Sequence, residues 1–471
     1  MAAGGLGWFF TRGTAANTSS VAVLPFANLS GDPAQAYFSD GLAEEVRSAL
    51  SRINGLKVIG RTSSEVLRND DATTAAQRLD VGSIVTGSVR RSPSTIRVSA
   101  QLVDGGDGTE KWSETFDRPT GDVLAIQTSI AEAVAQQLRS RLGAADRAAL
   151  TAGGTKNAAA QDLLLKADAN VDGSIDGYRT RIALYDAAIA LDPDYALAYS
   201  GKAVAESNLV AYYADSAAEF ETGFEKASAV ARKAIALAPE LSDGHYALGF
   251  NLISALDFTG GWVEYQRAIA IPGCSTRNMV SVANFLAQIG HSRRADALWN
   301  QANARDPLDP SVARSRGYLL VRRGAYQEAL AVIEKLMADE PTSTNVRNGL
   351  AAALLLSGRY ADAARAADQL PHEHPNWFVI RSVAAARTGD RAQAAAILAA
   401  MRQKAGDSAH YQYAQMLSQM GDRDGAMAEL EASYRARDPG LGFLPTDEHL
   451  KPLRGDPRFA SLIARLSFPK P

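Results

Sequence analysis

The first residues to consider are those whose types and spacing could support catalysis or metal binding. His372, Glu373 and His374 are adjacent potential metal ligands, but Pro371 and Pro375 enclose them in a turn, and no third ligand lies nearby in the sequence. We therefore predict a solvated connector here rather than a metal site.

Three further patterns suggest chemistry. The run from Asp104 to Gly108 is rich in glycine and aspartate, yet it lacks the Lys-Ser/Thr pair of a phosphate loop and the distal Glu of a calcium loop. We predict a hairpin turn there. Cys274 is the only cysteine, and the sequence places no histidine beside it, which argues against a nucleophile. Asp40 has two interpretations: it caps a helix that begins near Leu42, or it marks an anion site at that helix end.

The composition sets limits on the class of protein. Hydrophobic residues make up 46% of the 471 residues and charged residues 21%, as in folded soluble proteins. The net charge of −3 provides no general attraction to nucleic acid or to anionic membranes. With one cysteine no intramolecular disulfide forms, which fits a reducing compartment and a bacterial periplasm equally well. We predict no catalytic group, no cofactor and no metal.

The first ten residues, MAAGGLGWFF, are apolar but too few to span a bilayer, and they lack the basic start of a signal peptide. They form either an apolar leader or the outer end of a membrane helix, followed by a linker to residue 20. On this basis we expect a periplasmic or inner-membrane-associated protein rather than a cytoplasmic one, with a possible membrane tether.

Two regularly spaced series of residues organise the larger part of the chain. Prolines recur every 33 to 35 residues, at Pro239, Pro272, Pro307, Pro341 and Pro375. In register with them, a glycine precedes an alanine by five residues in the pairs Gly290/Ala295, Gly324/Ala329, Gly358/Ala363, Gly389/Ala394 and Gly421/Ala426. Glycine adopts the left-handed conformation that ends a helix, and proline stops the next helix because it has no N–H to donate. This pattern predicts a tandem array of helix pairs.

A period near 34 residues with this helix–turn–helix pattern resembles the tetratricopeptide repeat family. We place eight repeats within residues 155–440, the first and last only approximately. The second is longer because Pro193 and Pro239 lie 46 residues apart. In the fifth, Gly317 and Ala329 are expected to let the two helices pack closely. Residues 441–471 are expected to form a capping segment, since the last repeat would otherwise expose its apolar face.

The preceding residues, 21–145, predict a small α+β domain. Strands are expected at residues 21–26, 56–60, 83–91, 96–103 and 110–116, and helices at 34–53, 64–67, 73–79 and 121–142. The stretches VAVLPFANLSGDPAQAYFSDGLAEEV and GSVRRS, IRVSAQLVD and KWSETFDR resemble the TolB-like amino-terminal domain, and PLRGDPRF at residues 452–459 resembles the end of the repeat arrays that follow it. In bacterial signalling proteins this module follows a class III adenylate cyclase domain or a winged-helix DNA-binding domain, and usually a membrane helix. Neither output domain precedes Val21 in this sequence, so neither activity is carried over.

The resemblance to tetratricopeptide proteins implies a curved array whose first helices line a concave, peptide-binding face. The family's groove positions fall on Asp243, Tyr246, Phe250, Arg277, Asn284, Gln288, Arg314, Tyr318, Arg322, Asn345, Asn348, Asn376, Arg387, Tyr411, Gln415 and Gln419. Asn and Gln can hold a peptide backbone, and Arg can pair with a carboxylate; the alternative is a merely solvated inner face. We expect a non-catalytic interaction protein, or alternatively the sensory part of a membrane-tethered cyclase or transcriptional regulator.

Overall fold

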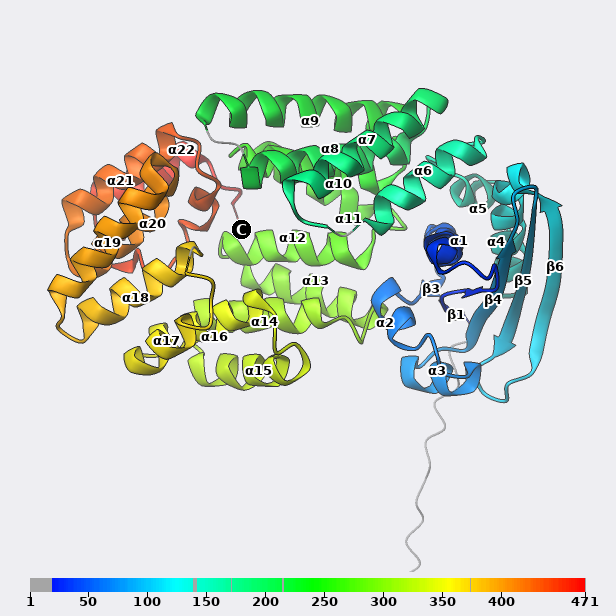
Figure 1. The fold of residues 1–471 in the computed structure, drawn as a ribbon, viewed down its shortest axis with the longest axis horizontal. Helices are drawn as coiled ribbons and strands as arrows, with labels where there is room; N and C mark the ends of the chain where they lie inside the picture. Colours follow the sequence, from blue (N-terminus) through cyan, green and yellow to red (C-terminus); the bar gives the residue numbers. More distant parts are fainter. Residues whose placement is uncertain (1–18, 139–141, 171, 214–215, 373, 471) are drawn as a thin grey trace, which may run out of the picture. The chain divides into compact units, whose positions relative to one another are not determined.

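The computed structural model describes residues 19–138, 142–170, 172–213, 216–372 and 374–470. The chain divides into two compact units, and the boundary falls between Thr151 and Ala152. The first unit is α+β and the second is a helical repeat array, as the sequence predicts (Figure 1). The apolar Met1–Phe10 segment lies outside the described residues. No helix in the described part of the chain combines the length and the apolar composition that crossing a bilayer requires.

The first unit is built on one mixed sheet with the strand order β3-β1-β4-β5-β6. β1 runs parallel to β3 and β4, β2 runs parallel to β4, and β4, β5 and β6 form an antiparallel meander. The strands are β1 (Ser20–Val23), β2 (Ala27–Asn28), β3 (Lys57–Val58), β4 (Ser83–Arg91), β5 (Thr95–Asp104) and β6 (Glu110–Pro119).

Helices α1 and α4 contact each other and the sheet, so both cover the same face. Along β5, Ile96, Val98 and Leu102 are buried while Arg97 and Gln101 are exposed, the alternation of a strand with one solvated face. The helices of this unit are η1 (Pro33–Gln35), α1 (Ala36–Ser51), α2 (Arg61–Val66), α3 (Ala72–Leu79), η2 (Thr120–Asp122), α4 (Val123–Leu138) and α5 (Ala144–Leu150).

Two expectations for this unit were wrong in detail. The strand expected at residues 21–26 stops at Val23, because Pro25 has no N–H to donate to the ladder, and pairing resumes at β2. Asp40 does not cap a helix. Asp32 instead caps η1 by accepting the Ala34 N–H, so the helical turns begin upstream, and Asp40 lies inside α1 and binds Arg68 at 2.8 Å.

The predicted hairpin turn at residues 104–108 is confirmed. Asp104 accepts the Gly106 N–H at 2.8 Å and pairs with the Lys111 ammonium at 2.6 Å, and Asp107 accepts the Thr109 N–H. The carboxylates therefore bind within their own turn and stabilise the link between β5 and β6.

The second unit contains eight helix pairs in its described residues, followed by a C-terminal segment. The pairs are α6 (Ala158–Ala169) and α7 (Ile175–Leu191), α8 (Ala196–Tyr213) and α9 (Ala217–Leu237), α10 (Ser242–Ser254) and α11 (Phe258–Ala270), α12 (Thr276–Gln288) and α13 (Ser292–Arg305), α14 (Pro310–Arg322) and α15 (Tyr326–Asp339), α16 (Thr344–Leu356) and α17 (Tyr360–Ala367), α18 (Pro375–Arg387) and α19 (Arg391–Ala405), α20 (His410–Met420) and α21 (Arg423–Arg435). The second repeat is longer because its two helices, α8 and α9, are long.

The glycine and alanine series is confirmed. Each glycine has a positive φ, between 73° and 94°, and each alanine is fully buried at the crossing of its helix pair. At Gly317 an added Cβ would lie 3.3 Å from the Ile333 side chain, so the fifth pair is close-packed. One proline has a different role: Pro375 does not end a helix but begins α18, where its missing N–H costs nothing because the first turn has no acceptor for it.

The C-terminal segment consists of η4 (Pro439–Phe443), η5 (Lys451–Leu453) and α22 (Pro457–Leu466), preceded by η3 (Gly406–Ala409) within the last repeats. α22 contacts α21 and buries Phe459, Leu462 and Leu466, while the capping role of residues 441–471 stays a prediction. The segment also reaches much earlier repeats. The Phe468 ring stacks on Phe258 with ring centroids 4.4 Å apart, and the Thr259 hydroxyl donates to the Ser467 carbonyl at 2.8 Å.

Candidate functional site: the inner face of the repeat array

The first helix of each repeat contacts the first helix of the next, from α12 through α14, α16 and α18 to α20. Tyr246 extends this row to α10, because its hydroxyl donates to Ser281 of α12 at 3.1 Å. These helices form one continuous wall, which we call the inner face. Returning contacts from the C-terminal segment to α11 and α12 show that the array curls around this wall.

Polar side chains of the inner helices bind groups of the neighbouring repeat. The Tyr318 hydroxyl donates to the Asn345 backbone carbonyl at 2.6 Å, and the Asn376 amide donates to the Asn348 side chain at 3.1 Å. Within one repeat, Arg314 of α14 pairs at 3.0 Å with Glu340 at the end of α15. Polar groups of adjacent repeats therefore lie next to one another on this face.

Other predicted residues of the inner face differ in exposure. Arg277, Asn284 and Asn345 are exposed. Tyr246 and Phe250 are half-buried and stack with their ring centroids 6.1 Å apart, and Asp243 is half-buried at the start of α10. We call the set Arg277, Asn284, Asn345, Asn348 and Asn376 the open half of the inner face.

Most of the remaining predicted residues contact the chain's own residues 439–453, which we call the closing segment. The Asp447 carboxylate accepts from the Tyr411 hydroxyl at 2.9 Å and from the Gln415 amide at 2.7 Å. The Gln419 amide donates to the His449 carbonyl at 2.6 Å.

Two more predicted residues hold the start of the closing segment. The Thr446 hydroxyl donates to the Gln288 carbonyl at 2.7 Å, across 158 residues of sequence, and the Arg322 guanidinium lies 4.9 Å from the Phe443 ring centroid. Gly442 approaches so closely that an added Cβ would lie 2.5 Å from the Gln288 amide nitrogen. Five predicted groove residues therefore already bind polypeptide of this chain.

Burial makes the closing segment part of the fold. Leu441, Leu444, Leu450 and Leu453 are each 0% exposed. Burying one leucine stabilises by about 1.5–3 kcal/mol, so the four together contribute on the order of 6–12 kcal/mol. A ligand that displaced the segment would have to supply that much free energy, which corresponds to a dissociation constant between roughly tens of micromolar and about nanomolar for displacement alone.

The buried contacts also change ionisation. Burial, reinforced by the nearby Asp447 charge, holds the pKa of Tyr411 well above its ordinary value, so this 3%-exposed phenol stays a hydrogen-bond donor. Burial raises the pKa of Asp438 as well, although the Gly440 and Tyr411 N–H groups oppose the shift. Burial lowers the pKa of Arg322.

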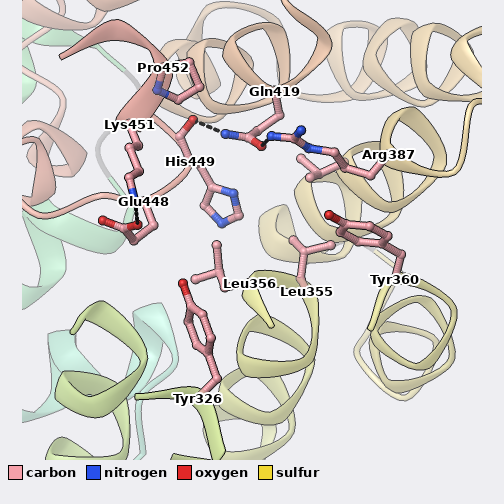
Figure 2. Close-up of a pocket in the computed structure, with 11 residues that line it drawn as sticks. Tyr326, Leu355, Leu356, Tyr360, Arg387, Gln419, Glu448, His449, Lys451 and Pro452 are labelled. Atoms are coloured by element: carbon pink, nitrogen blue, oxygen red, sulfur yellow. Dashed lines mark hydrogen bonds and ion pairs between the residues drawn. The ribbon is translucent and has the colours of Figure 1, made fainter. Parts of the chain in front are cut away.

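A cavity lies between the inner helices and the closing segment (Figure 2). Its volume is about 280 Å³, and its walls come from the start of α15, the ends of α16 and α18, the start of α17, α20 and residues 448–452. It includes only two of the predicted residues, Arg387 and Gln419. Its lining is Tyr326, Leu355, Leu356, Tyr360, Val383, Arg387, Gln419, Glu448, His449, Lys451 and Pro452.

The other residues considered for chemistry have structural partners. His374 caps α18 by accepting the Asn376 N–H at 3.1 Å, His372 stacks on Trp377, and Glu373 lies outside the described residues. Burial raises the pKa of the Cys274 thiol to about 11, so a thiolate is not its neutral-pH form. Among the residues that the structure describes, no group of three or more His, Cys, Asp or Glu side chains is placed to hold a metal ion.

Comparison with known proteins supports the repeats. A profile of the tetratricopeptide repeat family matches residues 320–387, which run from the end of α14 to the end of α18. The array therefore contains tetratricopeptide repeats, of the kind found in protein-interaction scaffolds.

Similar solved structures include a tetratricopeptide repeat protein from Parabacteroides merdae, with 14% identity, a TM-score of 0.40, and coverage of 57% of this chain and 99% of that one. Yeast Tom70 shares 14% identity at a TM-score of 0.39, covering 65% and 67%. A human IFIT1 dimer with PPP-AAAA shares 13% at 0.41, covering 67% and 86%. TM-scores below 0.5 say nothing about the ligands of this chain.

One curated relative is a Rhizobium meliloti (strain 1021) protein named "Putative adenylate cyclase 3". It is 38% identical over 149 residues, which is 31% of this chain. The chain spans only a quarter of that relative's length.

Proposed function

We propose that this protein is a non-catalytic scaffold whose repeat array binds a protein or peptide on the open half of the inner face. One observation carries the proposal. The inner face already holds another part of the chain, the closing segment, and it does so through residues at the groove positions that the repeat pattern predicts. Gln419 binds a backbone carbonyl, and Tyr411 and Gln415 bind a carboxylate, which are groups that any peptide offers.

The open half offers the same chemistry without a bound segment. Asn345, Asn348 and Asn376 present amide or carbonyl groups from two neighbouring repeats, and Arg277 adds an exposed cation on α12. The amide of an asparagine both donates and accepts, so it can pair with a peptide backbone in either direction. A partner docked here would leave the closing segment in place.

Photo-crosslinking tests this proposal. A photoreactive residue at Asn284 or Asn376, in the full chain expressed in its own cells, should trap one partner, which then binds the purified chain. The matched control places the same residue at Lys335 or Arg391, both exposed on second helices. Equal trapping from the controls, or no reconstituted binding, would contradict the proposal.

A second function is favoured by the relative named as an adenylate cyclase, together with the resemblance of residues 21–145 to the TolB-like domain. On this account the chain is the sensory part of a membrane-tethered cyclase or transcriptional regulator, and the repeats receive the signal. Reading the DNA upstream of the Met1 codon is the discriminating observation, because an in-frame extension that encodes a membrane helix favours this alternative. The purified chain itself is expected to form no cyclic AMP from ATP.

A further inference from the structure

The cavity beneath the closing segment has an uneven distribution of polar groups. Leu355, Leu356 and Val383 give it an aliphatic floor, and Pro452 adds an apolar contact from the closing segment. Figure 2 shows the Tyr326 and Tyr360 hydroxyls directed toward this floor from two sides, and within the described residues neither phenol has a hydrogen-bond partner. The cavity therefore combines an apolar body with unused donors at its edge.

Arg387 is the charged group at one end of the cavity. Its guanidinium donates to the Gln419 side-chain carbonyl at 2.6 Å, and no carboxylate of the described chain lies within ion-pair distance of it. Neighbouring arginines differ in this respect, since Arg314, Arg359 and Arg381 each pair with an acidic side chain. A guanidinium has five N–H donors, so most of the hydrogen-bonding capacity of Arg387 remains available.

The cations at the other end of the cavity already have an acidic partner. The Glu448 carboxylate is bound by Arg454 at 3.0 Å and by Lys451 at 3.4 Å. An anion is therefore attracted most directly to Arg387, whose guanidinium has no carboxylate partner among the described residues. The volume of about 280 Å³ lies at the lower limit for small-molecule pockets and is too small for a helix.

We propose that this cavity binds a compact carboxylate with an aliphatic body. The carboxylate pairs with the Arg387 guanidinium and accepts from the Tyr360 hydroxyl, and the aliphatic part lies on Leu355, Leu356 and Val383. A bidentate guanidinium–carboxylate pair supplies orientation as well as affinity. This cavity is separate from the open half of the inner face, because the closing segment forms one wall of the cavity and does not cover the open half.

Titration of the full chain with hexanoate, followed by ligand-detected NMR, tests the inference. Hexanoate should bind, and hexylamine and hexan-1-ol should bind at least about tenfold more weakly, because only the acid makes charge-assisted hydrogen bonds. A second comparison asks whether the ligand is a free acid or the C-terminus of a peptide. A tetrapeptide that ends in leucine is titrated beside its carboxamide. Tighter binding of the peptide acid than of hexanoate indicates a peptide C-terminus.

Variants locate the site. Arg387→Gln should weaken hexanoate binding about tenfold or more, Arg387→Lys should restore part of it, and Tyr360→Phe should weaken it several-fold. Arg391→Gln is the matched control, because Arg391 is an exposed arginine four residues further along that does not line the cavity. Thermal unfolding establishes that each variant is folded.

The inference would be overturned by equal binding of hexanoate and hexan-1-ol, by an unchanged hexanoate affinity in Arg387→Gln, or by no binding of either hexanoate or the peptide acid. Partner crosslinking through Asn284 is measured separately, so failure here leaves that result unaffected.

Discussion

The phenol of Tyr411 donates a hydrogen bond of 2.9 Å to the carboxylate of Asp447, from the first turn of α20 to a residue 36 positions later. The same carboxylate accepts from Gln415, so one acidic side chain of the closing segment satisfies two groove residues. This relationship divides the inner face into a half filled by the chain itself and a half that remains open.

Removing the Asp447 carboxylate should destabilise the array. Asp447→Ala leaves the Tyr411 hydroxyl and the Gln415 amide without their acceptor, and hydrogen bonds to a charged group contribute about 1.5–3 kcal/mol each. We expect the free energy of unfolding in urea to fall by about 3–6 kcal/mol. Asp339→Ala, an exposed carboxylate on α15, is the control and should change it by less than about 0.5 kcal/mol. Equal effects would show that the closing segment is not held by Asp447.

Truncating Leu450 tests the apolar anchor. Leu450 is fully buried, so Leu450→Ala should cost about 2–5 kcal/mol and expose the closing segment to protease. Leu191→Ala removes the same atoms from a side chain that is 47% exposed, and it should cost far less. Proteolysis followed by mass spectrometry would reveal cleavage within residues 442–453 in the first variant only. Resistance of both variants to cleavage would argue against a closing segment that depends on its leucines.

Asp438 gives a pH-dependent prediction. Its pKa is raised in the folded state, mainly by burial, so the folded protein holds this proton more tightly than the unfolded chain does. The resulting stability is present below the ordinary Asp value of about 3.8 and is lost as the pH rises through the raised folded value.

Asp438→Asn keeps an acceptor for the Gly440 N–H and removes the buried charge. The variant should therefore gain stability relative to the parent as the pH rises above about 4, and the gain should level off at higher pH. Urea midpoints measured for both proteins from pH 3 to 8 provide the comparison. A difference that stays constant across this range would contradict the assignment.

Much of this architecture could be predicted because its signals are local. Gly290, Gly324 and Gly358 mark helix ends through their own backbone conformation, and Ala295 and its equivalents mark helix crossings through their size. In β5 the alternation of Ile96, Arg97 and Val98 was sufficient to identify the strand. Each of these patterns depends only on residues that lie close together in the sequence.

The closing segment and the cavity could not be predicted in this way. Thr446 contacts Gln288 and Ser467 contacts Thr259 because the repeats between them curve, and no local sequence pattern encodes where that curve brings the chain back. A partial signal did exist for the cavity: Tyr326 and Tyr360 each follow a helix-ending glycine by two residues, which places an aromatic ring at the same position of successive repeats.

The open half makes a prediction about binding that is separate from stability. Asn348→Ala combined with Asn376→Ala removes one hydrogen bond between neighbouring repeats and the two amides proposed to hold a peptide backbone. We expect partner affinity to fall about tenfold or more while the thermal midpoint changes by only a few degrees. Asn300→Ala on α13, whose amide lies outside the inner face, should leave the affinity unchanged. Surface plasmon resonance with the reconstituted partner measures both.

The most direct measurement is hydrogen exchange, followed by mass spectrometry, on the full chain with and without its crosslinked and purified partner. Binding should slow exchange in α12, α16 and α18, while residues 444–453 remain protected to the same extent in both states. Faster exchange in residues 444–453 on binding, or new protection confined to α13, α15 and α19, would contradict the claim that a partner occupies the open half beside a fixed closing segment.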